Sequence, residues 1–250
     1  MTRPKHQADQ LCDLISTNNG VPVLFPTIEI RSILNSEKLS TIFSNIDQYD
    51  YIIFVSRNAV NVVFDHYLNN DDMSSANILL LAIGSGTAMA LSERNLTNVL
   101  HAGVQADSEN LLMLEQLDSE HVRNKKILIV RGVGGRELLA DNLSTRGATV
   151  EYAEVYQRVI PDYPLQQCQE LWQNEPPAAI IISSNEGLEN FLNLMDERSL
   201  KTIFNTPLVV MSTRNAELAI EKGFESNIGI AEEKNDKGLL SVLLDLVGEY

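Results

Sequence analysis

Residues 125–158 hold the residue types most able to do chemistry. An apolar run meets Arg131, a glycine-rich turn at 132–135 follows, and the segment then leads through a helical pattern to Tyr156. Glycines that open a helix expose backbone N–H groups, and such groups bind anions. The hydroxyl of Tyr156 is a candidate proton donor, although a lone tyrosine near a strand end is more often a packing residue. The pattern predicts an anion-binding turn close to a proton donor.

The glycine turn does not fit a nucleotide-binding motif. A dinucleotide fingerprint that starts at Gly132 needs a third glycine at position 137, where the chain has Glu137. A carboxylate at that position would repel a pyrophosphate, and the Gly-Lys-Ser/Thr of a P-loop is absent from the sequence. The glycines either expose N–H groups to carboxylates or merely permit a tight turn, and both interpretations stay open.

The spacing of the histidines and serines does not support a metal site or a nucleophilic serine. The four histidines are scattered through the chain at His6, His66, His101 and His121. None of them has the partner at i+4 or the Cys/His spacing that metal ligation needs. Ser183 and Ser184 follow an apolar run, but no Gly-x-Ser-x-Gly elbow frames them, which favours a helix cap over a nucleophile. We therefore expect neither a metal nor a cofactor.

The elements that must position these residues repeat one pattern. An apolar strand, a short polar joint and an amphipathic helix recur at 51–64, 78–93, 126–143, 178–195 and 208–224. Continuous apolar runs are typical of parallel strands buried on both faces, and Ser, Asn, Thr or Gly at the joint suits a helix N-cap. Shorter strands are predicted at 21–24, 98–100, 149–155 and 227–230. The fold class is α/β.

Two polar or proline-rich breaks divide the chain. Together with the strand count they predict two domains, one of them discontinuous. Residues 1–32 plus 161–250 form the discontinuous α/β domain, residues 36–155 form the inserted one, and linkers lie near 31–36 and 155–161. Ser-Arg-Asn-Ala at 56–59 is echoed by Ser-Thr-Arg-Asn-Ala at 212–216. This echo hints at related halves but is too short to prove a duplication.

Composition excludes several classes of partner. The net charge of the 250-residue chain is −15, which argues against nucleic acid because phosphate binding relies on clustered basic residues. No apolar run approaches the length of a membrane span, and the first ten residues lack the apolar segment of a secretion signal. Two distant cysteines suggest free thiols in the cytoplasm. Ten strands in two domains would satisfy their own sheet edges, so we expect a monomer.

Several motifs, in their order and spacing, resemble the uroporphyrinogen-III synthase family. The resemblance runs along nearly the whole chain, and its most specific block lies between Arg131 and Arg158. The motifs are Thr2-Arg3-Pro4, Phe25-Pro26-Thr27-Ile28-Glu29-Ile30, Phe54-Val55-Ser56-Arg57-Asn58-Ala59-Val60, Ile83-Gly84-Ser85-Gly86-Thr87-Ala88, Arg131-Gly132 with Arg136-Glu137, and Tyr156-Gln157-Arg158. Only Met1 precedes Thr2, so the first strand is expected either to be short or to begin upstream.

The resemblance implies two flavodoxin-like parallel-sheet domains, joined by a two-stranded β-ladder, with the substrate between them. The implied reaction cyclises hydroxymethylbilane, a linear tetrapyrrole, with loss of water and inversion of the terminal pyrrole ring. The product is uroporphyrinogen III, an intermediate of haem biosynthesis. No cofactor is implied.

The resemblance also implies roles for individual residues. Tyr156 is similar to a tyrosine that assists loss of the hydroxyl. Where some members place paired threonines, this chain has Arg214 and Asn215, which makes Arg214 a candidate for carboxylate binding. The full set of expected substrate-binding residues is Arg3, Ser56, Asn58, Ser85, Thr87, Arg131, Gly132, Gly134, Arg136, Ser184 and Arg214.

Two other classes of protein stay open on the sequence alone. One is a cytoplasmic two-domain protein that binds a small anion without turnover. The other is a nucleotide-dependent enzyme that uses the glycine turn, an interpretation that Glu137 argues against.

Overall fold

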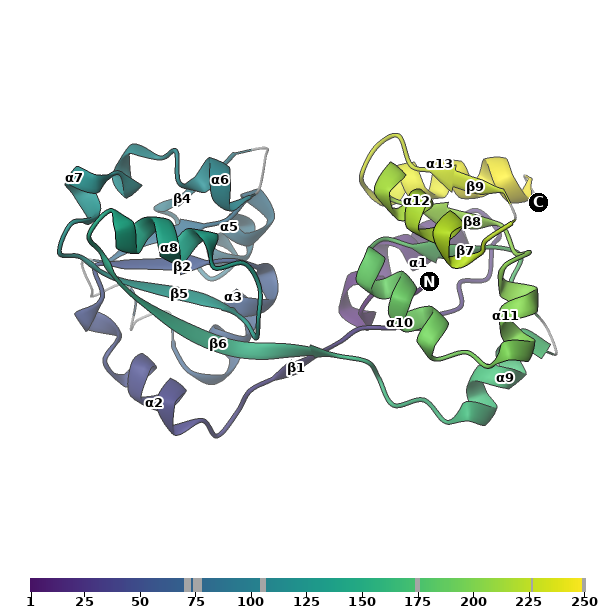
Figure 1. Cartoon of the computed structure of the whole chain (residues 1–250), viewed down its shortest axis with the longest axis horizontal. Helices are drawn as coiled ribbons and strands as arrows, with labels where there is room; N and C mark the ends of the chain where they lie inside the picture. The colour runs from purple at the N-terminus through teal and green to yellow at the C-terminus, as the bar shows by residue number, and fades with distance from the viewer. Residues whose placement is uncertain (70–72, 74–77, 104–106, 174–175, 226, 249–250) are drawn as a thin grey trace. The chain divides into compact units, whose positions relative to one another are not determined.

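The computed structural model describes residues 1–69, 73, 78–103, 107–173, 176–225 and 227–248 (Figure 1). The chain divides into two compact units. Unit 1 consists of residues 1–29 and 159–250, and unit 2 consists of residues 30–158. Helices and strands alternate in both units, so the predicted α/β class is confirmed.

Unit 2 is built on a six-stranded sheet with the order β1-β6-β5-β2-β3-β4. Its strands are β1 (Glu29–Ser32), β2 (Tyr51–Phe54), β3 (Leu79–Ala82), β4 (Val99–His101), β5 (Lys126–Gly132) and β6 (Thr149–Val159). Every pairing from β4 to β6 is parallel. The chain enters unit 2 through β1 and leaves through β6, so these neighbours run in opposite directions.

The order of this sheet reverses at β2. The strands that follow β2 in the chain, β3 and β4, extend to one side of it, and the later strands β5 and β6 extend to the other. In open α/β sheets a crevice forms at such a reversal, outside the carboxyl ends of the two central strands. Here those strands are β2 and β5, which pair from Tyr51 and Ile127 to Phe54 and Val130.

Helices cover both faces of the unit 2 sheet. One face packs α2 (Glu37–Ser44), α3 (Arg57–His66) and α5 (Ser85–Ser92). The other packs α6 (Ser108–Leu111), α7 (Ser119–Val122) and α8 (Leu138–Thr145). A 3₁₀ turn, η2 (Ile46–Gln48), follows α2, and another, η3 (Glu115–Leu117), lies between α6 and α7. Neighbouring residues of β2 point to opposite faces, and both faces are buried: Ile52 belongs to one core cluster and Ile53 to the other. This explains the continuous apolar run in the sequence.

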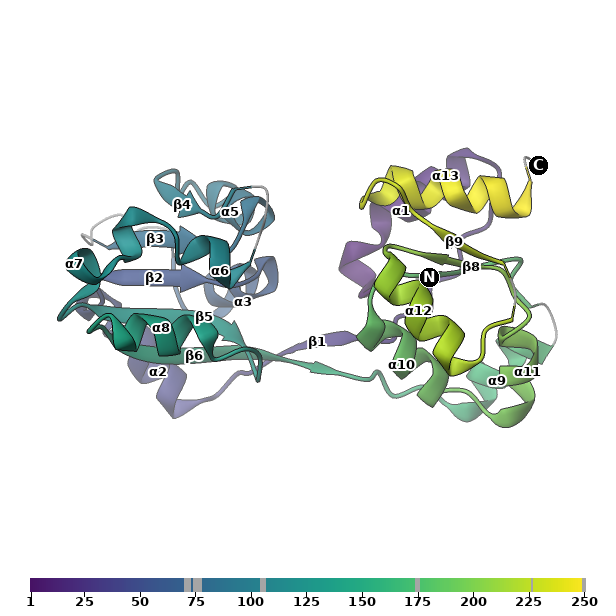
Figure 2. The same ribbon diagram turned by 45° about the horizontal axis from the view of Figure 1, so that its top comes forward.

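Unit 1 is built on a smaller parallel sheet with the order β7-β8-β9. Its strands are β7 (Ile180–Ile182), β8 (Leu208–Val210) and β9 (Ile228–Ile230). Figure 2 shows α1 (Asp9–Thr17) and α13 (Asp236–Val247) on one side of these strands. The other side packs α9 (Leu165–Gln173), α10 (Asn185–Asn193), α11 (Glu197–Ile203) and α12 (Thr213–Lys222), and a 3₁₀ turn, η1 (Lys5–Gln7), precedes α1.

The strand predicted at 21–24 is wrong, because these residues form no regular strand. Pro22 lacks the N–H that a ladder needs, and Val21 is 87% exposed. Met1 bonds to the segment at one residue and just beyond it at another: the amino group of Met1 donates to Val23 O, and Phe25 N donates to Met1 O. The remaining short strands lie close to their predicted places as β4, β6 and β9.

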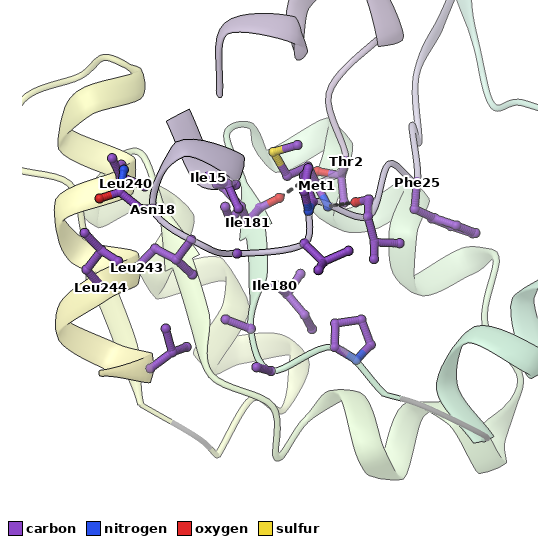
Figure 3. Close-up of a pocket in the computed structure, with 18 of the residues that line it drawn as sticks. Met1, Thr2, Ile15, Asn18, Phe25, Ile180, Ile181, Leu240, Leu243 and Leu244 are labelled. Atoms are coloured by element: carbon purple, nitrogen blue, oxygen red, sulfur yellow. Dashed lines mark hydrogen bonds between the residues drawn. The ribbon is translucent and has the colours of Figure 1, made fainter. Parts of the chain in front are cut away.

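An apolar cavity of about 410 Å³ lies within unit 1 (Figure 3). Figure 3 shows leucines of α13 on one side of the cavity, and Met1 and Thr2 beside Ile180 and Ile181. None of the predicted site residues lines it. Its lining is mainly aliphatic, which is unsuited to proton transfer or to binding a carboxylate.

Candidate functional site

A second pocket, of about 510 Å³, opens in unit 2 at the reversal of the sheet order. The carboxyl ends of β2 and β5 and the glycine turn form its centre. Its lining consists of Val55, Ser56, Ile83, Asp107, Ser108, Ile129, Arg131, Gly132, Val133, Gly134, Gly135, Arg136, Leu139, Tyr152, Tyr156 and Arg158. Because this is the place where open α/β sheets bind ligands, and because half of its lining residues have polar side chains, we take it as the candidate site.

Ser56 stands at the joint between β2 and α3. It adopts extended backbone with φ −162° and ψ 158°, and its Oγ accepts a hydrogen bond from Ala59 N at 3.1 Å. This is an N-cap, which satisfies one of the backbone donors that the first turn of a helix leaves without a partner. The same Oγ lies 3.0 Å from the hydroxyl oxygen of Tyr156. One small side chain therefore joins the start of α3 to the predicted proton donor.

Tyr156 reaches this position through an irregularity in the pairing of β5 with β6. Arg131 pairs with Glu154, but the next residue of β5, Gly132, pairs with Tyr156, so that Val155 is an extra residue on β6. Val155 and Tyr156 both pack into the same core cluster, which strict alternation of side chains forbids for consecutive residues. The tyrosine is 3% exposed. Its ring is packed and only its hydroxyl end meets polar atoms of the site.

Arg131 ends the apolar part of β5 and is 9% exposed. Its Nη2 donates to Glu137 Oε1 at 2.9 Å and to Glu154 Oε1 at 3.1 Å, and its Nε donates to Glu154 Oε1 at 3.2 Å. The guanidinium carbon lies 3.6 Å from the centroid of the Tyr152 ring. Glu154 Oε1 also accepts from Gly134 N at 3.3 Å. Two carboxylates thus pair with this cation, and one of them, Glu154, ties it to the glycine turn.

The ionisation of this cluster follows from its contacts. Hydrogen bonds from Tyr152, at 2.7 Å, and from Arg131 lower the pKa of Glu137. Burial acts to lower the pKa of Arg131, but its contact with Glu137 and the neighbouring charges outweigh burial and leave that pKa raised. Burial, and then the bond to Glu137, raise the pKa of Tyr152. At neutral pH Arg131 and Glu137 are therefore charged, and the phenol of Tyr152 beside them is neutral.

The structure brings part of the predicted site together. Six of the predicted residues line the unit 2 pocket, namely Ser56, Arg131, Gly132, Gly134, Arg136 and Tyr156. Arg136 is exposed and its Nη1 lies 3.2 Å from Glu109 Oε1. Three others, Asn58, Ser85 and Thr87, lie in the first turns of α3 and α5 in the same unit but do not line the pocket.

The remaining predicted residues belong to unit 1. Arg3 forms an ion pair with Asp236 in the first turn of α13. Ser184 caps α10 by accepting from Gly187 N at 3.0 Å, and Arg214 is exposed in the first turn of α12. Their roles toward a substrate stay predictions that rest on the resemblance.

The predicted site set did not include four polar residues of the pocket, namely Asp107, Ser108, Tyr152 and Arg158. Asp107 caps α6 and, with Ser108, lines the side of the pocket that follows β4. Tyr152 lies under Arg131. An Asp-Ser pair before a helical pattern is an N-cap signal that could have revealed the first two. Nothing local could have revealed Tyr152, because it reaches the site only through the pairing of β6 with β5.

The described residues also bear on two other functions, metal binding and membrane insertion. In that part of the chain no group of three or more His, Cys, Asp or Glu side chains could hold a metal ion. Within the same ranges no helix is long and apolar enough to cross a membrane.

Fold, joints and pocket define a two-unit α/β protein with its candidate site at the reversal of a parallel sheet. The family model of uroporphyrinogen-III synthase HemD matches residues 9–241. The chain belongs to this family. It is 29% identical over 244 residues to the uroporphyrinogen-III synthase of Escherichia coli K12, with 97% of this chain and 98% of the relative covered. It is 31% identical over 175 residues to that of Proteus mirabilis, with 70% and 86% covered.

Solved structures support the fold. The synthase of Helicobacter pylori 26695 matches with a TM-score of 0.62 at 17% identity, covering 89% of this chain and 92% of the other. A mutant synthase of the extreme thermophile Thermus thermophilus matches over 100% of both chains with a TM-score of 0.59 at 14% identity. The family is one of enzymes, which favours a synthase over the alternative of a binding protein without turnover.

Proposed function

We propose that the protein acts as a uroporphyrinogen-III synthase in haem biosynthesis. It would take hydroxymethylbilane, remove the terminal hydroxyl as water, close the ring and invert the last pyrrole. Membership of the family and the near full-length match to the E. coli enzyme support the reaction class. The observation that carries the assignment to this site is the Tyr156 hydroxyl, held 3.0 Å from Ser56 Oγ at the polar pocket between β2 and β5.

We assign Tyr156 the role of proton donor to the departing hydroxyl. The C–O bond breaks as the proton arrives, water leaves, and an azafulvene cation remains on the substrate. Closure of the ring releases a pyrrole proton, which restores the balance of the reaction. A flexible bilane also closes without an enzyme to the uninverted isomer. The protein therefore acts mainly by holding the chain in a curled conformation, which lowers the entropic cost of closure and steers the product.

The substrate's carboxylates require donors rather than strong bases. Arg136, exposed at the edge of the pocket, is the side chain that we propose for one carboxylate, because a rim cation can exchange its partner Glu109 for substrate. Arg131 is balanced by Glu137 and Glu154, so we propose that it shapes the glycine turn at Gly132 and Gly134. We propose that no cofactor takes part.

Incubation of the purified chain with hydroxymethylbilane tests this function. We expect the oxidised product, resolved by chromatography, to be mainly the type III isomer. Its formation should be faster than the spontaneous closure measured without protein. If only the type I isomer forms, at the spontaneous rate, the synthase assignment is lost.

We further propose that the protein works as a monomer in the cytoplasm and binds no nucleic acid. The net charge of −15 supports the last point, since phosphate binding relies on clustered basic residues. The two cysteines, Cys12 and Cys168, are free thiols, which suits a reducing compartment. Light scattering coupled to size-exclusion chromatography tests the monomer: a mass of twice 27.9 kDa would contradict it.

A further inference from the structure

Three features of unit 2 converge on one side chain, that of Tyr156. They are the extra residue at Val155, the missing side chain of Gly132 and the hydroxyl of Ser56. Each comes from a different strand or joint, on β6, on β5 and after β2. Strand bulges near active sites commonly re-aim a side chain. This convergence indicates that the orientation of Tyr156 is built in and does not merely follow from packing.

Gly132 provides the space for the tyrosine ring. A Cβ placed on Gly132 would lie 2.7 Å from both Cε2 and Cζ of Tyr156, closer than real Cβ atoms approach other atoms. The backbone makes no such demand, because Gly132 lies within β5 and is not a positive-φ residue. Gly134 and Gly135 are the opposite case, with φ of +75° and +110° and no atom within 4 Å of an added Cβ. Gly132 therefore lacks a side chain because the ring of Tyr156 occupies that space. Gly134 and Gly135 are glycines because their backbone has a positive φ.

Ser56 provides the polar partner of the Tyr156 hydroxyl. The direction of their hydrogen bond decides where the tyrosine proton can point. Its Oγ accepts from Ala59 N through one lone pair, and its own proton remains available for donation to Tyr156. When Ser56 donates, Tyr156 accepts and keeps its own proton for another acceptor in the pocket. The same donated bond also stabilises the phenolate that is left after the proton is given away.

We infer that Ser56 and Gly132 are positioning residues for Tyr156: Ser56 donates to its hydroxyl, and Gly132 makes room for its ring. The inference rests on the proposed synthase function and goes beyond it, since Ser56 was expected to bind substrate. Neither residue needs to touch the bilane. Both affect the reaction only through the Tyr156 hydroxyl. Their effects on kcat can therefore be compared in chains with and without that hydroxyl.

A double-mutant cycle tests the inference. The variants are Ser56→Ala, Gly132→Ala, Tyr156→Phe and the two combinations with Tyr156→Phe. Correct placement of a proton donor contributes on the order of 10²-fold or more to rate, so we expect the two positioning variants to lower kcat by about 10-fold and to change KM less than about 2-fold. In the Tyr156→Phe background, the same substitutions should lower kcat by less than about 2-fold, because groups that act through one atom are not additive. Fully additive effects would overturn the inference.

Two further variants separate positioning from folding. Ser36 caps α2 in the same unit by accepting from Leu39 N at 3.3 Å, whereas the hydroxyl of Tyr156 meets Ser56, so Ser36→Ala should lose the cap and keep kcat. Ser56→Thr keeps a capping hydroxyl and should recover most of the kcat that Ser56→Ala loses. If Gly132→Ala does not fold, the Ser56 variants alone decide. A wild-type chain that yields no type III isomer removes the proposed function, whereas an active wild type with an unaffected Ser56→Ala removes only this inference.

Discussion

Two joints, one in each unit, use the same local device and serve different chemistry. Ser56 precedes α3 in unit 2 and Ser212 precedes α12 in unit 1, and each follows a short parallel strand. Their backbones are nearly identical, with φ and ψ of −162° and 158° at Ser56 and −158° and 158° at Ser212. Each Oγ accepts from the N–H three residues on, at 3.1 Å from Ala59 and 3.3 Å from Asn215. The echo between 56–59 and 212–216 thus marks two equivalent N-caps.

The second partner of each serine makes the difference. Ser56 meets the hydroxyl of Tyr156, which β6 delivers, whereas Ser212 donates to the side-chain Oδ1 of Asn215 at 2.8 Å. Asn215 in turn donates to Asn185 Oδ1 at 2.6 Å and links the joints before α10 and α12. In both units the serine caps the start of the helix. The residue supplied by a neighbouring element decides whether the joint can also handle a proton.

The largest expected effect falls on the tyrosine of the unit 2 joint. Tyr156→Phe should lower kcat by about 10²-fold, or about 2.7 kcal/mol of transition-state stabilisation, because a positioned proton donor is lost while the ring stays. The matched control lies in unit 1. Tyr163 donates to Pro26 O at 3.0 Å and stacks on Phe25, so Tyr163→Phe removes a comparable hydrogen bond and should leave kcat unchanged. Steady-state rates of type III formation measure both, and equal rates for Tyr156→Phe and wild type would refute the donor role.

The next effect concerns the charged network around Arg131 in unit 2. Arg131→Met should destabilise the fold by about 2 kcal/mol. Removing one partner of a buried pair typically costs about 3–5 kcal/mol, but both carboxylates can regain water here. Glu137 and Glu154 have side chains 53% and 37% exposed. Urea unfolding measures the loss. Arg214→Met, at an exposed residue of unit 1, should stay within about 0.5 kcal/mol of wild type, and an equally small change at Arg131 would show that its network adds no stability.

The sequence predicts the joints well because their signals are local. Apolar runs followed by Ser, Asn or Gly placed β2, β3, β5, β7 and β8 and the helices after them. Such local patterns carry no information about contacts between residues that are far apart in the sequence. The balancing of Arg131 by Glu154 depends on how β6 pairs with β5, and the placing of Tyr156 depends on an extra residue in that pairing. The false strand at 21–24 has a related cause, since an apolar segment needs a partner and Pro22 limits pairing.

A smaller effect compares the two serines directly. Ser56→Ala and Ser212→Ala should each cost about 1 kcal/mol of stability, because each removes an N-cap with the same geometry. Only Ser56→Ala should also lower kcat. Thermal unfolding and steady-state kinetics on the same preparations separate the two properties. A similar fall in kcat for both variants would mean that capping, and not contact with Tyr156, accounts for the loss.

The smallest effect is a difference in pH dependence between the units. The pKa of Glu137 is lowered in the folded protein by its bonds to Tyr152 and Arg131, so its contribution to stability is present above its ordinary pKa of 4.5 and is lost as pH falls through the lowered value. Glu137→Gln should therefore destabilise the protein at pH 7 and cost progressively less as the solution is acidified.

In unit 1 the contact between Asn185 and Asn215 carries no titrating group, so the loss caused by Asn185→Ala should stay the same across that range. Urea midpoints of both variants and wild type, measured from about pH 7 down to about pH 3, test the contrast. A constant penalty for Glu137→Gln would mean that its carboxylate charge does not stabilise the folded protein.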